Sequence, residues 1–276
     1  MSGNADLPEG FNFKHSLGQN FITDKNLLAA IVADAGVTSS DVVLEIGAGA
    51  GALTELLSGA AERVVAVEVD KKLAPYLKNK FAGTNVEVLE ADILKLDDTF
   101  LRGLFDKPFK IVANLPYYIT TPILFKFIEG GFELKDITVM VQKELAERLS
   151  ARANTKDYGG ITVVLDYRGD VEYKRTVPRT VFHPRPNVDS SIVKFTPNRA
   201  KYNVTDFEFT DKVIKSAFAM RRKTLVNNIC AAFNLPRGQG EEVVVASGLA
   251  VNIRGEVLTT AQFIELTKKI GEKLCK

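Results

Sequence analysis

One short segment, Asn114-Leu115-Pro116-Tyr117, combines groups that can activate an aromatic amine. An amino group on a purine ring is a weak nucleophile because its lone pair is delocalised into the ring. The amide oxygen of Asn114 and a backbone carbonyl, which we assign to Leu115, can accept its two hydrogens and direct the lone pair at an electrophilic carbon. Pro116 restricts the turn, and the ring of Tyr117 can stack on a base extruded from a nucleic acid. The segment therefore points to alkylation of a nucleobase amine, provided that a strand precedes it.

Residues upstream of this segment can bind a nucleoside-bearing cofactor. The glycine-rich run 45–51 follows an apolar, β-branched run, so its backbone can approach a ligand closely. Glu68 lies 21 residues after Gly47, where a carboxylate can accept ribose hydroxyls, and Asp92 can accept from an adenine amino group. The glycine spacing ends one residue short of Gly-x-Gly-x-x-Gly, so the site fits S-adenosylmethionine at least as well as NAD. An NAD site and a purely structural turn are the alternatives.

Short apolar runs alternate with helical spacing of apolar residues, as expected for an α/β fold. Strands alternating with helices imply right-handed crossovers and a mostly parallel, Rossmann-like sheet. Polar residues that follow the strands then meet at the carboxyl edge of the sheet. We interpret Asp70, just beyond Glu68, as a solvated turn residue. The predicted strands lie near residues 42–46, 64–69, 86–89, 111–113, 137–141 and 161–165.

The pattern changes near residue 200, and the rest of the chain reads as helical. Residues 211–233 form one apolar stripe at helical spacing, with three cations beside it, and a last helix covers about residues 260–274. We therefore expect an α/β domain over residues 1–198 and a small all-helical domain over residues 199–276. The three cations, which an exposed helix face would also explain, are Arg221, Arg222 and Lys223.

The formal net charge of +2 hides an uneven distribution along the chain. Residues 1–167 carry 17 Lys and Arg against 23 Asp and Glu, whereas residues 168–276 carry 19 against 11. This asymmetry indicates a polyanion such as RNA, contacted mainly by the second part, because phosphate binding draws on Lys and Arg. A solvated basic face is the alternative.

Composition excludes several classes of site. Cys230 and Cys275 are too few and too far apart for a disulfide framework or a zinc site. His15 and His183 are too few for histidine-based catalysis, so no metal is expected. No stretch approaches the roughly 20 apolar residues that span a bilayer, and the first eight residues lack a leader pattern. We therefore expect a soluble, unexported protein.

With these motifs, the chain resembles the ribosomal RNA adenine N6-dimethyltransferase family from about residue 14 to residue 263. Further family signatures appear as Leu-Gly-Gln-Asn-Phe at residues 17–21 and as Phe-x-Pro-x-Pro-x-Val within residues 181–190. Residues 218–225 and 254–258 resemble the signatures of the family's helical domain. The fold that this resemblance implies is a Rossmann-like S-adenosylmethionine-dependent methyltransferase domain followed by a helical domain.

The resemblance implies roles for individual residues. It places Asn20 and Ile22 against the methionine part of the cofactor and Phe182 on the second face of the target base. Burial in the core is the alternative for Phe182, because this chain has 17 Phe. Arg148 and Arg152 are expected on one side of a surface helix. The predicted sites are Asn114, Leu115, Pro116, Tyr117 and Phe182 for catalysis; Asn20, Ile22, Glu45, Gly47, Gly49, Glu68, Asp92 and Asn114 for the cofactor; and Arg148, Arg152, Arg185, Arg221, Arg222 and Lys223 for RNA.

The resemblance also implies a reaction and a substrate. S-adenosylmethionine would methylate N6 of two adjacent adenines in the 3′-terminal hairpin loop of small-subunit (16S) rRNA, on an immature subunit in the bacterial cytoplasm, with the enzyme a monomer. No general base is required, because the product ammonium loses its proton to water. The alternatives are an erythromycin-resistance type methylase of large-subunit rRNA, a non-catalytic ribosome-assembly or transcription factor on the same fold, and, more distantly, a dehydrogenase. Ala48 and Tyr118 depart from the family pattern without removing a proposed contact.

Overall fold

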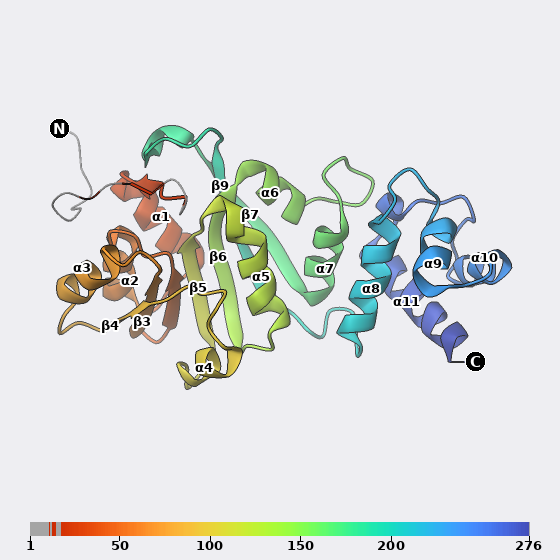
Figure 1. Ribbon diagram of the computed structural model, residues 1–276, viewed down its shortest axis with the longest axis horizontal. Helices are drawn as coiled ribbons and strands as arrows, with labels where there is room; N and C mark the ends of the chain where they lie inside the picture. Colours follow the sequence, from red (N-terminus) through yellow and green to blue (C-terminus); the bar gives the residue numbers. More distant parts are fainter. Residues whose placement is uncertain (1–10, 12, 15–17, 276) are drawn as a thin grey trace. The chain divides into compact units, whose positions relative to one another are not determined.

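The computed structural model describes residue 11, residues 13–14 and residues 18–275 (Figure 1). The predictions made for His15, Leu17 and the first eight residues lie outside this part of the chain. None of the helices in the described part combines the length and the apolarity that crossing a lipid bilayer requires.

The chain forms two compact units. The first consists of Met1–Ala146 and Glu172–Pro197, and the second of Glu147–Val171 and Asn198–Lys276. The change of pattern near residue 200 lies close to the end of the first unit at Pro197. Residues 147–171, which we expected in the first domain, belong to the second unit, because the helix within them packs against the C-terminal helices.

A seven-stranded sheet organises the first unit, in the order β4-β3-β2-β5-β6-β9-β7. The five strands from β4 to β6 are parallel, and β9 is antiparallel to β6. The α/β prediction with a mostly parallel sheet is therefore confirmed. The strands are β2 (Val42–Ile46), β3 (Arg63–Glu68), β4 (Val86–Glu90), β5 (Phe109–Asn114), β6 (Leu134–Gln142), β7 (Gly169–Val177) and β9 (Ser190–Pro197).

The direction of strand addition reverses at β2, which pairs with β3 on one side and with β5 on the other. In open α/β sheets, ligands bind outside the carboxyl ends of the strands at such a reversal. The strands around it end at Ile46, Glu68 and Asn114. Three of the predicted motifs therefore begin at one edge of the sheet (Figure 1).

Helices of the first unit bury apolar faces against this sheet. In α1, Asp24 caps the first turn by accepting the N–H groups of Asn26 and Leu27, and Gly36 ends the helix in the left-handed conformation. Its apolar face, including Ile31, packs into the core beside sheet residues. The helices are α1 (Lys25–Ala35), α2 (Ala52–Ala60), α3 (Leu73–Lys80), α4 (Asp98–Gly103), α5 (Thr120–Glu129) and α6 (Lys143–Leu149), which runs into the second unit.

A small second sheet ties two distant segments of the first unit together. Strand β1 (Phe21–Ile22) pairs antiparallel with β8 (Phe182–His183), so that Ile22 lies opposite Phe182. The N–H of Thr23 continues the pairing by donating to the carbonyl oxygen of Val181 at 3.0 Å. The N-terminal signature is thereby joined to the proline-containing segment.

The second unit is helical, as expected, but one predicted strand is wrong. Residues 161–165 lie within a helix whose run from Thr162 to Leu165 is buried at every position. A short apolar run without exposed positions gives no periodicity that separates helix from strand, and here packing decides. The helices of this unit are α7 (Gly160–Arg168), α8 (Phe207–Phe218), α9 (Leu225–Phe233), α10 (Arg237–Ala246) and α11 (Thr260–Leu274).

The helix predicted over residues 211–233 is divided into α8 and α9 by a turn. Thr224 caps α9 by accepting the N–H of Asn227, and the side-chain amide of Asn228 donates to the carbonyl oxygen of Ala217 at 2.9 Å. The three cations at 221–223 therefore lie in this turn and not beside a continuous helical stripe.

Candidate functional site

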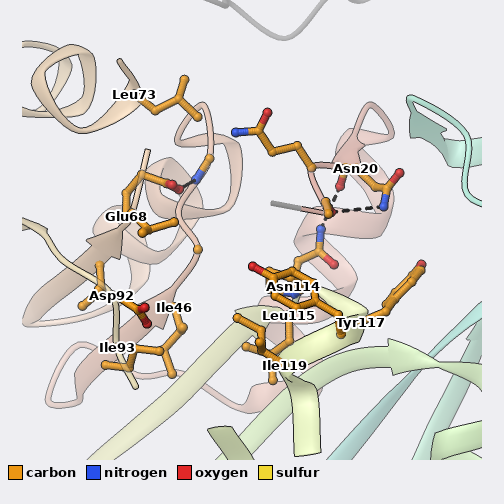
Figure 2. A pocket seen from close by; sticks show the side chains of 18 of the residues that line it. Asn20, Ile46, Glu68, Leu73, Asp92, Ile93, Asn114, Leu115, Tyr117 and Ile119 are labelled. Atoms are coloured by element: carbon orange, nitrogen blue, oxygen red, sulfur yellow. Dashed lines mark hydrogen bonds between the residues drawn. The ribbon is translucent and has the colours of Figure 1, made fainter. Parts of the chain in front are cut away.

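A cavity of about 200 Å³ opens at the carboxyl edge of the sheet, where the strand order reverses. Figure 2 shows Glu68 and Asp92 on one side of it, with Asn114 and Tyr117 on the other. Of the predicted residues, those that line it are Asn20, Gly47, Gly49, Glu68, Asp92, Asn114, Leu115, Pro116 and Tyr117.

The glycine-rich loop between β2 and α2 needs glycine at Gly49. Its φ of +59° is in the left-handed region, and a Cβ placed there would lie 2.6 Å from the ring of Phe21. The segment Gly18–Ile22, which we call the strap, therefore packs directly on the loop. Gly47 also has a positive φ, and its N–H donates to the carbonyl oxygen of Val67 at 2.8 Å.

Glu68 presents a buried carboxylate to the cavity. Its Oε2 accepts the N–H of Gly49 and its Oε1 accepts the N–H of Asp70, each at 2.8 Å. Burial raises the pKa of Glu68 above its usual value. Each oxygen accepts one of these two backbone bonds, and a carboxylate oxygen has two acceptor sites, so each retains capacity for a hydroxyl of a ligand.

Asp92 supplies a second carboxylate in the loop after β4. Its Oδ1 accepts the N–H of Leu94 at 3.1 Å, and its Oδ2 lies 3.5 Å from the ammonium of Lys95. The apolar side chains of Ile46, Leu73 and Ile93 lie near the two acids in the lining. Two acceptor groups beside apolar surface suit a nucleoside, whose ring is apolar on its faces and polar at its edges.

The side chain of Asn114 is oriented by the strap. Its Nδ2 donates to the backbone carbonyl oxygen of Asn20 at 3.1 Å. A carbonyl only accepts, so this contact requires the nitrogen there and leaves Oδ1 without a donor among the described residues. The N–H of Leu115 donates to the carbonyl oxygen of Met140, and no described residue donates to the carbonyl oxygen of Leu115. Two acceptors therefore remain available at this end of β5.

Tyr117 borders a second cavity next to the first. Its hydroxyl lies 2.7 Å from that of Ser190, which holds the ring in place, and burial raises the pKa of Tyr117. The second cavity, of about 340 Å³, is also lined by Gln142 and by the segment 184–188, with Arg185 among its residues. The ring of Tyr117 thus lies where a base entering from the second cavity would meet Asn114.

Three predicted site residues lie in the core and do not line the first cavity. Ile22 and Phe182 are 6% and 5% exposed and belong to one apolar cluster. The burial of Phe182, whose strand β8 pairs with β1, favours the core alternative over the stacking role expected for it. Glu45 is buried on β2, and its Oε2 has no hydrogen-bond partner among the described residues. Burial, with the charge of Glu68 adding to it, raises the pKa of Glu45 to about 8.

The predicted RNA-binding side chains are all exposed. Arg148 is in α6, but this helix ends at Leu149, so Arg152 does not share a helical side with it, contrary to the prediction. The second unit, which contains five of these six residues, carries 17 Lys and Arg against 12 Asp and Glu. The sixth, Arg185, lies in the first unit at the second cavity.

Sequence reasoning missed the role of Asp70. This residue is only 1% exposed, so its interpretation as a solvated turn residue is wrong. Its carboxylate accepts from the ammonium of Lys14 and from the side-chain amide of Gln19, each at 2.9 Å. The Glu-x-Asp spacing places Asp70 beside Glu68, but nothing local indicates partners more than 50 residues away. Tyr118, which is 59% exposed and lines the first cavity, was also missed as a lining residue.

Comparisons with known proteins identify the family of this chain. A family model described as Ribosomal RNA adenine dimethylase matches residues 10–270. The chain is 42% identical over 274 residues to Ribosomal RNA small subunit methyltransferase A of Geobacillus thermodenitrificans (strain NG80-2), covering 95% of this chain and 92% of that protein. It is 41% identical over 278 residues to the protein of the same name from Bacillus licheniformis, and the match covers 96% of this chain and 94% of that protein.

Two solved structures share the fold over nearly the whole chain. One is a dimethyladenosine transferase from Plasmodium falciparum, with a TM-score of 0.79, 28% identity and coverage of 92% of this chain and 98% of that chain. The other is the 23S rRNA methyltransferase ErmE, with a TM-score of 0.70, 26% identity and coverage of 91% and 99%. The family match and the sequence relatives together show that this chain belongs to the ribosomal RNA adenine dimethylase family of methyl-transferring enzymes.

Proposed function

We propose that this enzyme transfers methyl groups from S-adenosylmethionine to N6 of two adjacent adenines in the 3′-terminal hairpin loop of small-subunit rRNA. The observation that carries the proposal is the arrangement of the first cavity, in which the acids Glu68 and Asp92 lie across from the acceptors of Asn114 and Leu115. The names of the sequence relatives support the small subunit as the source of the RNA.

The acidic side of the cavity suits S-adenosylmethionine. The carboxylate of Glu68 would accept hydrogen bonds from the ribose hydroxyls, and that of Asp92 would accept one from the adenine amino group. Asn20, in the strap, lies at the part of the lining where the methionine portion would extend. S-adenosylmethionine supplies a methyl group on a positively charged sulfur, and the nearby carboxylates complement that charge. Three buried residues receive no role in binding the cofactor or the base here, because they do not line the first cavity and instead stabilise the surrounding core: Ile22, Glu45 and Phe182.

The opposite side of the cavity activates the target amine. Oδ1 of Asn114 and the carbonyl oxygen of Leu115 accept the two N6 hydrogens, which turns the nitrogen lone pair away from the ring and toward the methyl group. Tyr117 stacks on the base, and Pro116 keeps the turn rigid. In the transfer, the N–C bond would form as the S–C bond of S-adenosylmethionine breaks, and the product ammonium would lose its proton to water. After the first transfer, rotation of the methylated amine presents its remaining hydrogen for a second cycle.

The exposed cations of the second unit and Arg185 supply contacts to RNA phosphates. The partner that we propose is an immature small ribosomal subunit, bound by a monomer in the bacterial cytoplasm, where such subunits assemble. The family resemblance and the bacterial relatives support these assignments.

Transfer of labelled methyl groups tests the proposal. The protein is incubated with labelled S-adenosylmethionine and with unmethylated small subunits, large-subunit RNA or DNA in parallel. Label confined to the small-subunit RNA is the expected result. Label in large-subunit RNA would contradict the proposed substrate, and tight RNA binding without any label would favour an assembly factor.

A further inference from the structure

Asp70 gathers three hydrogen-bond donors at the end of β3, outside the lining of the cavity. Besides the ammonium of Lys14 and the side-chain amide of Gln19, its carboxylate accepts the backbone N–H of Lys72 at 2.9 Å. Its own N–H is the donor to Oε1 of Glu68. Only an acceptor-only group satisfies three converging donors, which explains a buried carboxylate at this position.

Gln19 connects this cluster to the strap. Its Nε2 donates to Asp70, and its Oε1 accepts the backbone N–H of Lys14 at 2.7 Å, so both ends of the amide are used. The next residue, Asn20, carries the carbonyl oxygen that receives Nδ2 of Asn114. Asp70 and Asn114 are thus joined through two consecutive residues of the strap.

We propose that Asp70 is a positioning residue for methyl transfer, acting through Gln19 and Asn20 on the amide of Asn114. Held by Asp70, the strap keeps the Asn20 carbonyl on Nδ2 of Asn114, which presents Oδ1 to the target amine. A displaced strap frees the Asn114 amide to rotate by half a turn and present N–H groups to the N–H groups of the base. This inference rests on the proposed function, because Oδ1 is the acceptor in that mechanism.

A pair of reciprocal substitutions tests the connection. Asp70→Asn places an amide nitrogen against Nε2 of Gln19 or against the ammonium of Lys14, so that two donors face each other. Gln19→Glu places two carboxylates together. In the double variant, the introduced amide at position 70 donates to the introduced carboxylate at position 19, whose other oxygen still accepts the N–H of Lys14.

Activity of the purified full-length protein is the first readout. At saturating S-adenosylmethionine and small subunits, we expect kcat to fall at least about tenfold in each single variant and to recover in the double variant. Asp41→Asn is the matched control, because Asp41 is a buried carboxylate with lysine and backbone partners ahead of β2, at the opposite end of that strand. The melting temperatures of Asp41→Asn and Asp70→Asn report loss of stability alone, and kcat of Asp41→Asn should match that of the unmodified protein.

Hydrogen exchange of the Asn114 side-chain amide is the second readout and does not depend on activity. Its NMR signal is assigned by its loss in Asn114→Ala. Exchange should be slow in the unmodified and double-variant proteins and fast in both single variants. Unchanged hydrogen exchange and unchanged kcat in Asp70→Asn would overturn the inference. A double variant whose kcat is as low as that of the single variants would also overturn it. An unmodified protein that transfers no methyl group but shows the expected exchange pattern would contradict the proposed function and leave the Asp70–Asn114 connection intact.

Discussion

Glu68 and Asn114 end two strands that are not neighbours, yet their side chains line one cavity from opposite sides (Figure 2). Strand β2 lies between β3 and β5, and its last residue, Ile46, lines the cavity together with the glycine-rich loop that follows. The reversal of strand order therefore opens space between a carboxylate and an amide. This space could hold one molecule against the carboxylate of Glu68 and a second against the amide of Asn114, so that a chemical group can be transferred between them.

Replacement of Asn114 by Ala should separate transfer from cofactor binding. The substitution removes one acceptor of the target amine and leaves Glu68 and Asp92 in place. We expect kcat to fall by at least about 100-fold, with the dissociation constant for S-adenosylmethionine changed by less than about tenfold. Label transfer and calorimetry measure the two quantities. An unchanged kcat would remove Asn114 from the mechanism.

Replacement of Glu68 by Gln should have the opposite profile. The variant loses the charge and one acceptor oxygen that the ribose hydroxyls require, so affinity for S-adenosylmethionine should fall by at least about tenfold. Calorimetry measures this change. Glu90→Gln is the control, because Glu90 lies beside Glu68 in the sheet and is exposed. Equal affinities in the two variants would contradict the ribose assignment.

Charge reversal of Arg221 and Arg222 should weaken binding to small-subunit RNA. If each contacts a phosphate, the slope of log affinity against log salt concentration should decrease in magnitude by about one per residue. The same reversal of Lys268 and Lys269 on α11 is the control for net charge. If the salt slope changed by the same amount in both double variants, the turn at residues 221–223 would have no specific role in RNA binding.

Glu45 should make stability depend on pH. With a pKa of about 8, the folded protein keeps this proton between about pH 4.5 and pH 8, while the unfolded chain loses it. The free energy of unfolding therefore decreases as pH rises through this window. Glu45→Gln does not titrate, so it should gain at least about 1 kcal/mol relative to the unmodified protein between about pH 5 and pH 8. Urea unfolding at pH 5 and at pH 8 measures the free energy of unfolding of both proteins. If the two proteins differed by the same amount at both pH values, the raised pKa of Glu45 would be contradicted.

Phe182 should behave as a core residue. Phe182→Ala is expected to lower the free energy of unfolding by about 3–5 kcal/mol. Phe182→Leu fills most of the same space and should keep kcat within about threefold of the unmodified value. Loss of a stacked base typically removes about 1–3 kcal/mol, so a leucine variant that folds stably but is slower by about tenfold or more would restore the stacking role.

The parallel strands and the site edge were predictable because their signals are local. A glycine follows the last residue of strand β2, and Glu68, Asp92 and Asn114 each follow or end a β-branched apolar run. The buried helix α7 was not predictable, because its run from Thr162 to Leu165 contacts the core all round and shows no period.

Contacts between distant segments were equally out of reach. The hydrogen bond that orients Asn114 comes from a residue 94 positions earlier, and the strand that buries Phe182 comes from the N-terminal segment. Asp70 looked like a turn residue because its partners, Lys14 and Gln19, reach it only in the folded chain. Sequence therefore predicted most of the residues that line the first cavity, and the fold determines which of the others are buried in the core.

Mapping the modified bases in small-subunit rRNA tests the central claim most directly. Unmethylated small subunits are incubated with the protein and S-adenosylmethionine, and fragments of the RNA are analysed by mass spectrometry. We expect two adjacent N6,N6-dimethyladenosines in the 3′-terminal hairpin loop. Unmodified adenines in this loop, together with dimethyladenosine in large-subunit RNA treated in the same way, would contradict it.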